Sequence, residues 1–297
     1  MDKSTNCEEP VKRADRILEE ALEASLDHPK AKGANDEWIR GEVAFSGEQL
    51  MRRNLAHANE VSLPARPRSS FYGTFVKRLI DIVLGGICLV ITAPINIALG
   101  IMTYFDVGSP IFFSQERTGK NLTSFKLVKF RNMTNECDEN GELLPPDRRI
   151  TEFGQFVRSH SLDELLNFWS VLKGDMSLIG PRPLPVEFTE HMTERHKARY
   201  AVRPGLECPQ MGPVPEGVDP AHVRFENDIA YVENISFVTD VMQAARLVGV
   251  VFRRGAESAY TGTDGHFIGY DRNGEAMSLG RLKDDETYRR EVLGVDE

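Results

Sequence analysis

LIDIVLGGICLVITAPINIALGIMTYF, from Leu79 to Phe105, is the stretch that decides how this chain is built. It is almost wholly apolar, and it exceeds the roughly 20 residues that a helix needs to cross the hydrocarbon core of a bilayer. On length alone, a straight transmembrane helix is therefore the simplest interpretation.

Three features oppose a straight span. Pro94 lies near the middle of the stretch, where its missing N–H and its ring break or bend a helix. Asp81 and Asn96 place polar groups inside the stretch, which is costly in hydrocarbon. Basic residues occur on both flanks, namely Arg66, Arg68, Lys77 and Arg78 before it and Arg117, Lys120, Lys126, Lys129 and Arg131 after it.

The basic flanks bear on how the stretch meets a membrane. Basic residues favour the cytoplasmic side, and a single span cannot place both flanks there. A helix that enters the bilayer, bends at Pro94 and returns satisfies both signals. From these residues alone, a straight transmembrane span and a re-entrant helix are supported about equally.

Composition divides the chain into four parts. Residues 1–70 form a polar, partly disordered arm and linker, in which 11–26 has the apolar spacing of one amphipathic helix. Residues 71–106 hold the membrane segment, 107–255 the main domain and 256–297 a C-terminal extension.

Short strand and helix patterns alternate in the main domain, which predicts a small mixed α/β fold. Strands are expected at 110–114 and 124–130, and helices at 152–158, 162–171, 185–200 and 237–252. The last helix is amphipathic, so it either lies on the membrane surface or packs into the core. Asp271-Arg-Asn-Gly274 predicts a hairpin turn in the extension.

The charge of the chain excludes one class of partner. Its formal net charge is −9, whereas binding to nucleic acid needs a basic surface that neutralises phosphates. Local basic clusters can still hold a small phosphorylated ligand. The sequence contains no P-loop or protein-kinase motif set, which argues against a soluble kinase.

The densest polar segments are RSHSLDELLN, from Arg158 to Asn167, and KGDMSLIGPRP, from Lys173 to Pro183. In one interpretation Ser161 and Glu164 form a capping box, and Asp163 is a further acid in the first turn of a helix. In another, the adjacent carboxylates share a divalent cation and one of them attacks phosphorus. Such an attack requires Mg²⁺ and cationic side chains around the phosphate. The candidates are Arg117, Lys129, Arg131, Arg158, Arg182 and Arg203.

From Lys77 to about Gly255 the chain resembles the bacterial sugar transferases known as monotopic phosphoglycosyl transferases. The matching pieces occur in the order typical of that family. They are KRLID at 77–81, Pro94, GSPIFFSQERTG at 108–119, KFRNM at 129–133, RITEFG at 149–154, SLDEL at 161–165, LKGDMSLIGPRP at 172–183, RPG at 203–205 and YVENISF at 231–237.

The resemblance implies a small α/β domain held at the cytoplasmic face of the bacterial inner membrane by a re-entrant helix. The anchor residues that it implies are Lys77, Arg78, Asp81 and Pro94. It implies transfer of a sugar 1-phosphate from a UDP-sugar to polyprenyl (undecaprenyl) phosphate with release of UMP, an initiating step of surface polysaccharide or glycoconjugate synthesis. A homodimer is left open.

The resemblance also implies residue roles. Asp163 matches the nucleophile that carries the phosphosugar covalently and touches Mg²⁺, and Glu164 matches the partner that positions or deprotonates the lipid phosphate. The basic candidates and Gln210 would bind substrate.

Several positions depart from the family pattern. Ala93 replaces the usual serine before the bend proline, Leu166 replaces a proline, and Trp169-Ser170 replaces an Asn-Val pair. Leu206-Glu-Cys-Pro-Gln210 differs from the usual Thr-Gly-Trp-Ala-Gln loop. A membrane-anchored scaffold or regulatory homologue without turnover is therefore the alternative to an enzyme.

Overall fold

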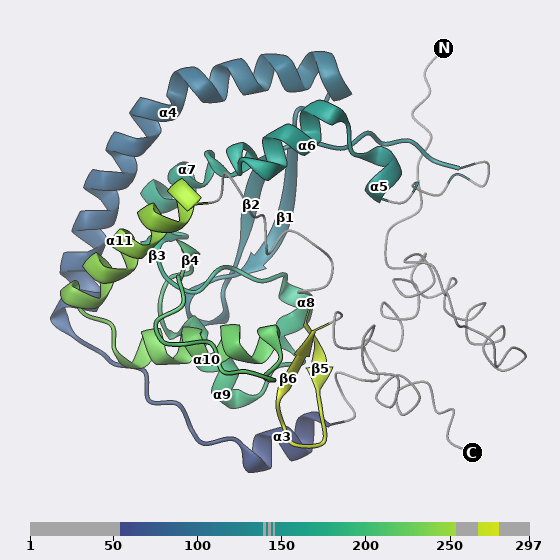
Figure 1. Ribbon diagram of the computed structural model, residues 1–297. Coiled ribbons are helices and arrows are strands. Elements are labelled where there is room, and N and C mark those ends of the chain that lie inside the picture. Colours follow the sequence, from purple (N-terminus) through teal and green to yellow (C-terminus); the bar gives the residue numbers. More distant parts are fainter. Residues whose placement is uncertain (1–53, 139–140, 142–143, 145, 254–266, 279–297) are drawn as a thin grey trace, which may run out of the picture.

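A long helix arches over a small domain of short helices and two-stranded sheets (Figure 1). The computed structural model describes residues 54–138, 141, 144, 146–253 and 267–278. In these ranges the expected mixed helix-and-strand domain is confirmed. The helix predicted at residues 11–26 lies outside the described residues.

The arching helix is α4 (Lys77–Val107), which continues from the π-helical turn η1 (Tyr72–Val76) and runs through Pro94 without interruption. Figure 1 shows that α4 is bent, so that it rises beside the domain and then crosses over it. Proline inside a helix removes one hydrogen bond and bends the axis. The Thr92 hydroxyl donates to the Cys88 carbonyl at 2.8 Å, and such back-bonding also favours bending.

Both ends of α4 contact the same domain. Near its start, the Asp81 carboxylate accepts hydrogen bonds of 3.0 Å from the Ser177 hydroxyl and the Leu178 amide. Near its end, the Arg131 guanidinium donates to the Val107 carbonyl. One stripe of the helix is thus covered by the domain at both ends, an arrangement that a straight span away from the domain does not provide.

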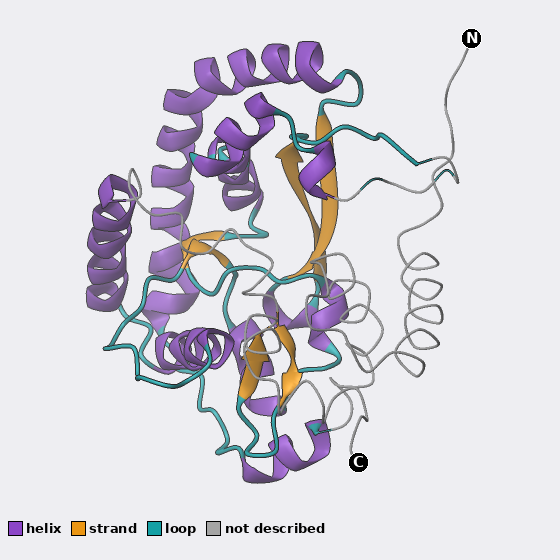
Figure 2. Cartoon of the chain, turned by 45° about the vertical axis from the view of Figure 1, so that its right-hand side comes forward, coloured by secondary structure: helices purple, strands orange, loops and turns teal. Residues whose placement is uncertain are grey.

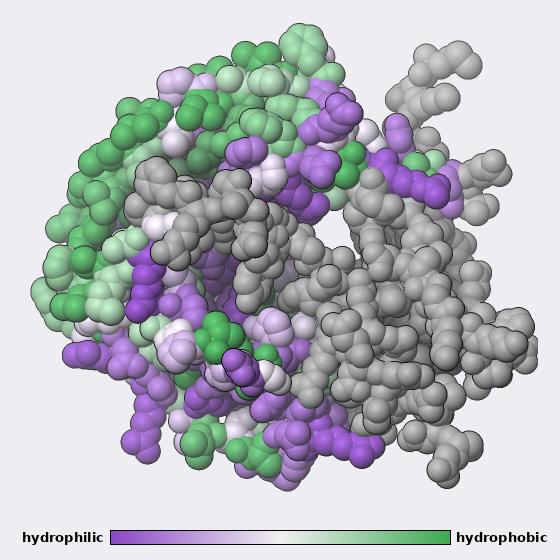
Figure 3. All heavy atoms as spheres, viewed as in Figure 1, coloured by the Kyte–Doolittle hydropathy of each residue, from purple (hydrophilic) through white to green (hydrophobic). Residues whose placement is uncertain are grey.

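The opposite face of α4 is apolar and exposed. In Figure 3 the outer side of the arch is almost continuously hydrophobic. The segment Tyr72–Val107 is long and apolar enough to cross a membrane. Because soluble proteins rarely expose so large an apolar surface, this face indicates contact with lipid or with another protein. The large exposed side chains of the whole helix are Leu79, Ile82, Val83, Leu84, Ile87, Val90, Ile91, Ile95, Ile97, Ile101, Met102, Tyr104 and Phe105.

Two sheets carry the residues under the arch. Strands β1 (Phe112–Thr118) and β2 (Ser124–Phe130) form near the two places where strands were expected, with β1 beginning and ending later than predicted, and they pair antiparallel around the turn η2 (Lys120–Leu122). Strands β3 (Ser177–Ile179) and β4 (Gly205–Glu207) pair in parallel, and the sequence did not predict them. The close approach of the two backbones here requires glycine, since a Cβ on Gly205 would lie 2.1 Å from the Gly180 nitrogen.

The helices are short and surround these sheets (Figure 2). The expected helix at 185–200 is broken into three pieces, because the Thr193 hydroxyl caps a new helix by accepting from the His196 amide. The helix expected at 237–252 is confirmed. The helical elements are α5 (Pro146–Arg149), α6 (Glu152–Ser159), η3 (Leu162–Glu164), α7 (Asn167–Lys173), α8 (Val186–Thr189), α9 (Glu194–Lys197), η4 (Ala198–Ala201), α10 (Pro220–Glu233) and α11 (Phe237–Arg253).

Two segments outside the main domain pack together on it. Helix α3 (Leu55–Val61) lies against the hairpin of β5 (Phe267–Tyr270) and β6 (Ala276–Ser278). The predicted hairpin turn is confirmed, with the Gly274 amide 3.1 Å from the Asp271 carbonyl. Ala58, Phe267 and Tyr270 share one buried cluster with residues of the main domain, so the two flanking segments complete a common core.

Candidate active site

The two adjacent carboxylates lie on the short turn η3, between α6 and α7. Ser161, just before this turn, has a φ of 54° in the left-handed region, and its side chain makes no capping hydrogen bond. The Glu164 carboxylate points instead to Lys129 and Arg182. The capping-box interpretation is therefore wrong, because long-range cations compete successfully for the carboxylate that would have closed the box.

Glu164 is an ionised, immobilised acid. Its carboxylate accepts from the Lys129 ammonium at 2.7 Å and from the Arg182 guanidinium. Burial by itself raises the pKa of Glu164, but Arg182 and Lys129 outweigh that effect and lower the pKa to about 2. Charge-assisted hydrogen bonds of this kind hold a side chain in one orientation.

Asp163 has the opposite environment. Its side chain is buried, and its nearest cation, the Lys129 ammonium, lies 3.9 Å away. Burial raises the pKa of Asp163, Lys129 and Arg158 oppose this rise, and the neighbouring Glu164 charge adds to it. Two neighbouring carboxyl groups whose pKa values are shifted in opposite directions are typical of sites where they have different tasks.

Arg182 links this pair to the loop that departs from the family pattern. Its guanidinium pairs with Glu164 and lies 3.6 Å from the carboxylate of Glu207, on β4. Its backbone carbonyl accepts a 2.8 Å hydrogen bond from Arg199, which forms a buried ion pair with Asp228. The sequence showed that Glu207 departs from the family pattern. It did not show that Glu207 lies beside Arg182, because strand β4 was not predicted.

Of the other residues predicted to bind substrate, Arg117 and Arg158 interact electrostatically with the carboxylate cluster, whereas Arg131 and Gln210 make structural contacts elsewhere. Arg117 lies close enough to Arg182 for the two charges to interact, and burial together with that charge lowers the pKa of Arg117 to about 10. Arg158 acts electrostatically on Asp163. Arg131 holds the end of α4, and the backbone carbonyl of Gln210 accepts from Arg246 at 3.0 Å.

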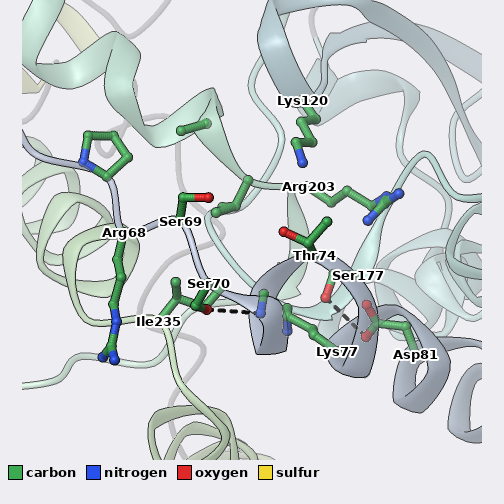
Figure 4. A pocket seen from close by; sticks show the side chains of 14 residues that line it. Arg68, Ser69, Ser70, Thr74, Lys77, Asp81, Lys120, Ser177, Arg203 and Ile235 are labelled. Carbon is green, nitrogen blue, oxygen red and sulfur yellow. Dashed lines mark hydrogen bonds between the residues drawn. The ribbon is translucent and has the colours of Figure 1, made fainter.

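Arg203 lies apart from Lys129 and Arg182, the cations that contact the carboxylate pair. Its Nε donates to the Gly174 carbonyl at 3.0 Å, and its side chain lines a small cavity at the base of α4 (Figure 4). Of the anchor residues, Lys77 pairs with Asp240 at 2.7 Å, and Arg78 donates to the carbonyls of Val171 and Leu172. These residues fix the first turns of α4 to the domain.

A divalent cation fits the carboxylate pair in one way. Magnesium in proteins usually takes one or two carboxylates and completes its shell with water and substrate phosphates. Glu164 is already occupied by two cations, so Asp163 is the carboxylate left for a metal. Within the described ranges, no group of three or more His, Cys, Asp or Glu side chains is placed to hold a metal ion. Most of the oxygen atoms that coordinate a magnesium ion here would therefore come from the substrate and from water.

The domain also has an apolar groove of about 640 Å³, whose lining includes two residues close in sequence to the charged cluster. It lies between the second half of α4, β1 and β2, and Leu166. Phe130 follows the Lys129 that contacts both carboxylates, and Leu166 is two residues beyond Glu164. The full lining is Asn96, Ile97, Gly100, Ile101, Tyr104, Phe105, Ile111, Phe112, Phe130 and Leu166.

Comparison with known proteins gives one consistent family. A family model described as bacterial sugar transferase matches residues 72–254. The uncharacterized sugar transferase EpsL of Bacillus subtilis is 38% identical over 166 residues, which cover 56% of this chain and 82% of that protein.

Two relatives have names that state a reaction. The UDP-N-acetylgalactosamine-undecaprenyl-phosphate N-acetylgalactosaminephosphotransferase of Aeromonas hydrophila is 31% identical over 198 residues, which are 64% of this chain but 47% of that protein. The UDP-glucose:undecaprenyl-phosphate glucose-1-phosphate transferase of Caulobacter vibrioides is 31% identical over 183 residues, covering 58% of this chain and 68% of that protein.

Proposed function

This chain belongs to the bacterial sugar transferase family, and on that premise we propose that it transfers a sugar 1-phosphate from a UDP-sugar to undecaprenyl phosphate and releases UMP. The relatives that carry a named reaction are undecaprenyl-phosphate sugar-phosphate transferases, which supports an enzyme of this kind. They differ in their sugar, so the comparisons support the reaction class and not one donor.

The observation that carries this proposal is the asymmetric carboxylate pair among cationic side chains. A buried Asp163 with a raised pKa is a partly desolvated carboxylate, and it faces Lys129 at 3.9 Å. An anion that attacks a diphosphate needs positive charge around the phosphorus. Lys129, Arg182 and Arg158 supply that charge from three different elements.

The proposed reaction has two displacements at one phosphorus atom. An Asp163 carboxylate oxygen bonds to the β-phosphorus of the UDP-sugar, and the bond from that phosphorus to the bridging oxygen breaks, so that UMP leaves with the electron pair. An oxygen of the lipid phosphate then bonds to the same phosphorus, and the Asp163 carboxylate leaves. Covalent catalysis of this kind divides one difficult transfer into two easier ones. A magnesium ion held by Asp163 and the diphosphate would offset the repulsion between them.

Glu164 is better suited to positioning than to proton transfer. A group with a pKa of about 2 is a weak base, whereas a phosphate monoester loses its second proton with a pKa of about 6. Glu164 therefore gains little by taking a proton from the lipid phosphate. Its two ion pairs instead keep Lys129 and Arg182 at the place where phosphate charge must be met.

We place the enzyme at the cytoplasmic face of the bacterial inner membrane, with α4 as a re-entrant helix. The exposed apolar face of α4, its bend and the contact of both ends with one domain support this placement. Helix α11 adds exposed apolar side chains at Phe237, Val238, Val241 and Met242, which favours its lying on the lipid surface. The apolar groove would then take the first isoprene units of the acceptor, with its phosphate at Lys129.

The test is a covalent-intermediate assay with purified full-length protein and a panel of UDP-sugars. The wild type should release UMP and retain a labelled phosphosugar, and Asp163→Asn, which is nearly isosteric, should lose both while remaining folded. EDTA should stop UMP release if the metal assignment is right. Full activity of Asp163→Asn removes this residue from the nucleophile role, and a wild type that releases no UMP from any donor favours the scaffold alternative.

A further inference from the structure

A second cavity, separate from the carboxylate pair, lies at the base of α4. It has a volume of about 130 Å³ and is enclosed by the linker before η1, the first turns of α4, the turn between β1 and β2 and the loop before β4. That volume exceeds the roughly 10–15 Å³ that one water requires, but it is well below the roughly 300–1,000 Å³ of sites for drug-sized ligands. A small group such as a phosphate fits, and a nucleotide sugar does not.

The walls of this cavity carry positive charge without matching carboxylates. Arg68, Lys120 and Arg203 line it, and across the described part of the chain none of the three has a carboxylate within ion-pair distance. Lys77 and Asp81 also line it; Lys77 is neutralised by Asp240, whereas the Asp81 carboxylate accepts from Ser177 and Leu178 and offsets one of the positive charges. The unmatched charge in the cavity is therefore positive.

Arg203 is held there under electrostatic stress. Burial lowers its pKa, the nearby guanidinium of Arg78 lowers it further, and the Asp81 carboxylate opposes this lowering only in part. Its Nε is used by the Gly174 carbonyl, so its remaining N–H groups are available to a ligand. An anion in the cavity would relieve the repulsion between these two arginines.

Hydroxyl groups complete the donor set. Ser69, Ser70 and Thr74 line the same cavity, and the Ser70 oxygen accepts from the Gly73 amide at 3.1 Å, which leaves its proton free to donate. Figure 4 shows the Lys120 amine reaching toward Thr74 and the Arg203 guanidinium beside it, whereas the Arg68 guanidinium points away. Phosphate oxygens are acceptors that such a set of ammonium, guanidinium and hydroxyl donors satisfies.

Two segments that line the cavity also carry exposed apolar side chains, which point away from the cavity. Phe71, Phe75 and Leu79, on the segment that forms one wall, are 73%, 63% and 64% exposed, and Leu122, in the turn that carries Lys120, is 53% exposed. Exposed aromatic and aliphatic side chains next to basic residues are typical of the membrane interface, where lipid phosphates lie. A segment with an exposed apolar face on one side and this basic cavity on the other suits the membrane interface, which makes a lipid headgroup a better match than a soluble phosphate.

We propose that this cavity binds the phosphodiester of a phospholipid headgroup and so fixes the depth of the first turns of α4 at the membrane surface. Lys120, Arg203 and the hydroxyls of Ser69 and Thr74 contact the phosphate oxygens. Phe71, Phe75 and Leu79, on the exposed face of the same segment, lie in the surrounding lipid. This site is distinct from the one that we propose for the acceptor substrate, and it does not depend on turnover.

The test measures ligand-induced stabilisation of the full-length protein in a neutral detergent. Dihexanoylphosphatidylglycerol is titrated, and its dissociation constant is obtained from the rise in the unfolding midpoint, since a ligand of the folded state stabilises it by mass action. Lys120→Gln should weaken binding by about fivefold or more, because it removes one charged contact. Lys126→Gln is the matched control, since Lys126 is an exposed lysine of the same hairpin outside the cavity.

Each outcome decides the proposal. Weaker binding by Lys120→Gln and by a second variant, Thr74→Val, with unchanged binding by Lys126→Gln, supports it. Equal binding by Lys120→Gln and Lys126→Gln overturns the site. Inorganic phosphate that binds as tightly as the phospholipid overturns the lipid assignment and leaves a site for free anions. The readout needs no donor sugar, so failure of the proposed transferase reaction would not affect it.

Discussion

Replacing Gly100 by leucine should block the apolar groove without disturbing the carboxylate pair. A Cβ at this position would lie 3.6 Å from a ring carbon of Phe130 and 3.7 Å from the Ile111 methyl, which is ordinary van der Waals contact. The backbone therefore accepts a side chain there, and Gly100 is inside a helix, where leucine has the better propensity. The added side chain would occupy the groove that we assign to the isoprenoid chain.

The magnitude follows from the carbons displaced. A leucine side chain takes the space of about four carbons of the acceptor, and each buried methylene is worth about 0.8 kcal/mol. The loss is about 3 kcal/mol, which corresponds to a decrease in kcat/KM on the order of 200-fold for undecaprenyl phosphate. Formation of the covalent intermediate from the UDP-sugar needs no acceptor, so it should keep its rate.

The assay compares three reactions of one enzyme preparation. It measures UMP release in a single turnover without acceptor, transfer to undecaprenyl phosphate, and transfer to a short acceptor such as geranyl phosphate. Gly86→Leu is the matched control, because a Cβ on Gly86 meets the Leu172 side chain at a similar 3.6 Å and Gly86 does not line the groove. An unchanged kcat/KM for the long acceptor in Gly100→Leu, or an equal loss in Gly86→Leu, would refute the assignment of the groove.

Three further predictions concern stability and topology. Arg199→Met should lower the free energy of unfolding by roughly 3–5 kcal/mol, because it leaves the buried Asp228 without its partner at 2.7 Å, and chemical denaturation should show a smaller loss when Asp228→Leu is added. Glu164 has a pKa lowered to about 2 from the usual 4.5, so its contribution of roughly 3 kcal/mol should be present above about pH 5 and lost as the pH falls toward 2; denaturation at several pH values should give Glu164→Gln a weaker dependence across this window, and identical slopes would contradict the ion pairs. Cysteines placed at Arg66 and Glu136, both exposed, in a chain whose native cysteines are replaced by serine, should be labelled from the same side of inner-membrane vesicles, whereas labelling from opposite sides would establish a straight span.

Local patterns predicted the parts of the fold that depend on near neighbours. The apolar run from Leu79 to Phe105 predicts a long helix because every side chain in it favours a non-aqueous surrounding, and α4 forms through the whole run. The β1–β2 hairpin and α11 follow from alternation and helical spacing. The carboxylate pair and its cations could be named from the order of the motifs, although their chemical roles remain predictions.

By itself, then, the sequence determined that an apolar helix accompanies a small mixed domain with an acidic pair among basic residues. Only the tertiary structure decided how those charges are matched. Glu164 turns from a local cap to Lys129 and Arg182, Glu207 comes beside Arg182 through the parallel β3–β4 pair, and Arg203 enters a separate cavity. Each of these contacts joins residues far apart in the chain, and in a buried setting such ion pairs are strong enough to override the preferences of a single turn.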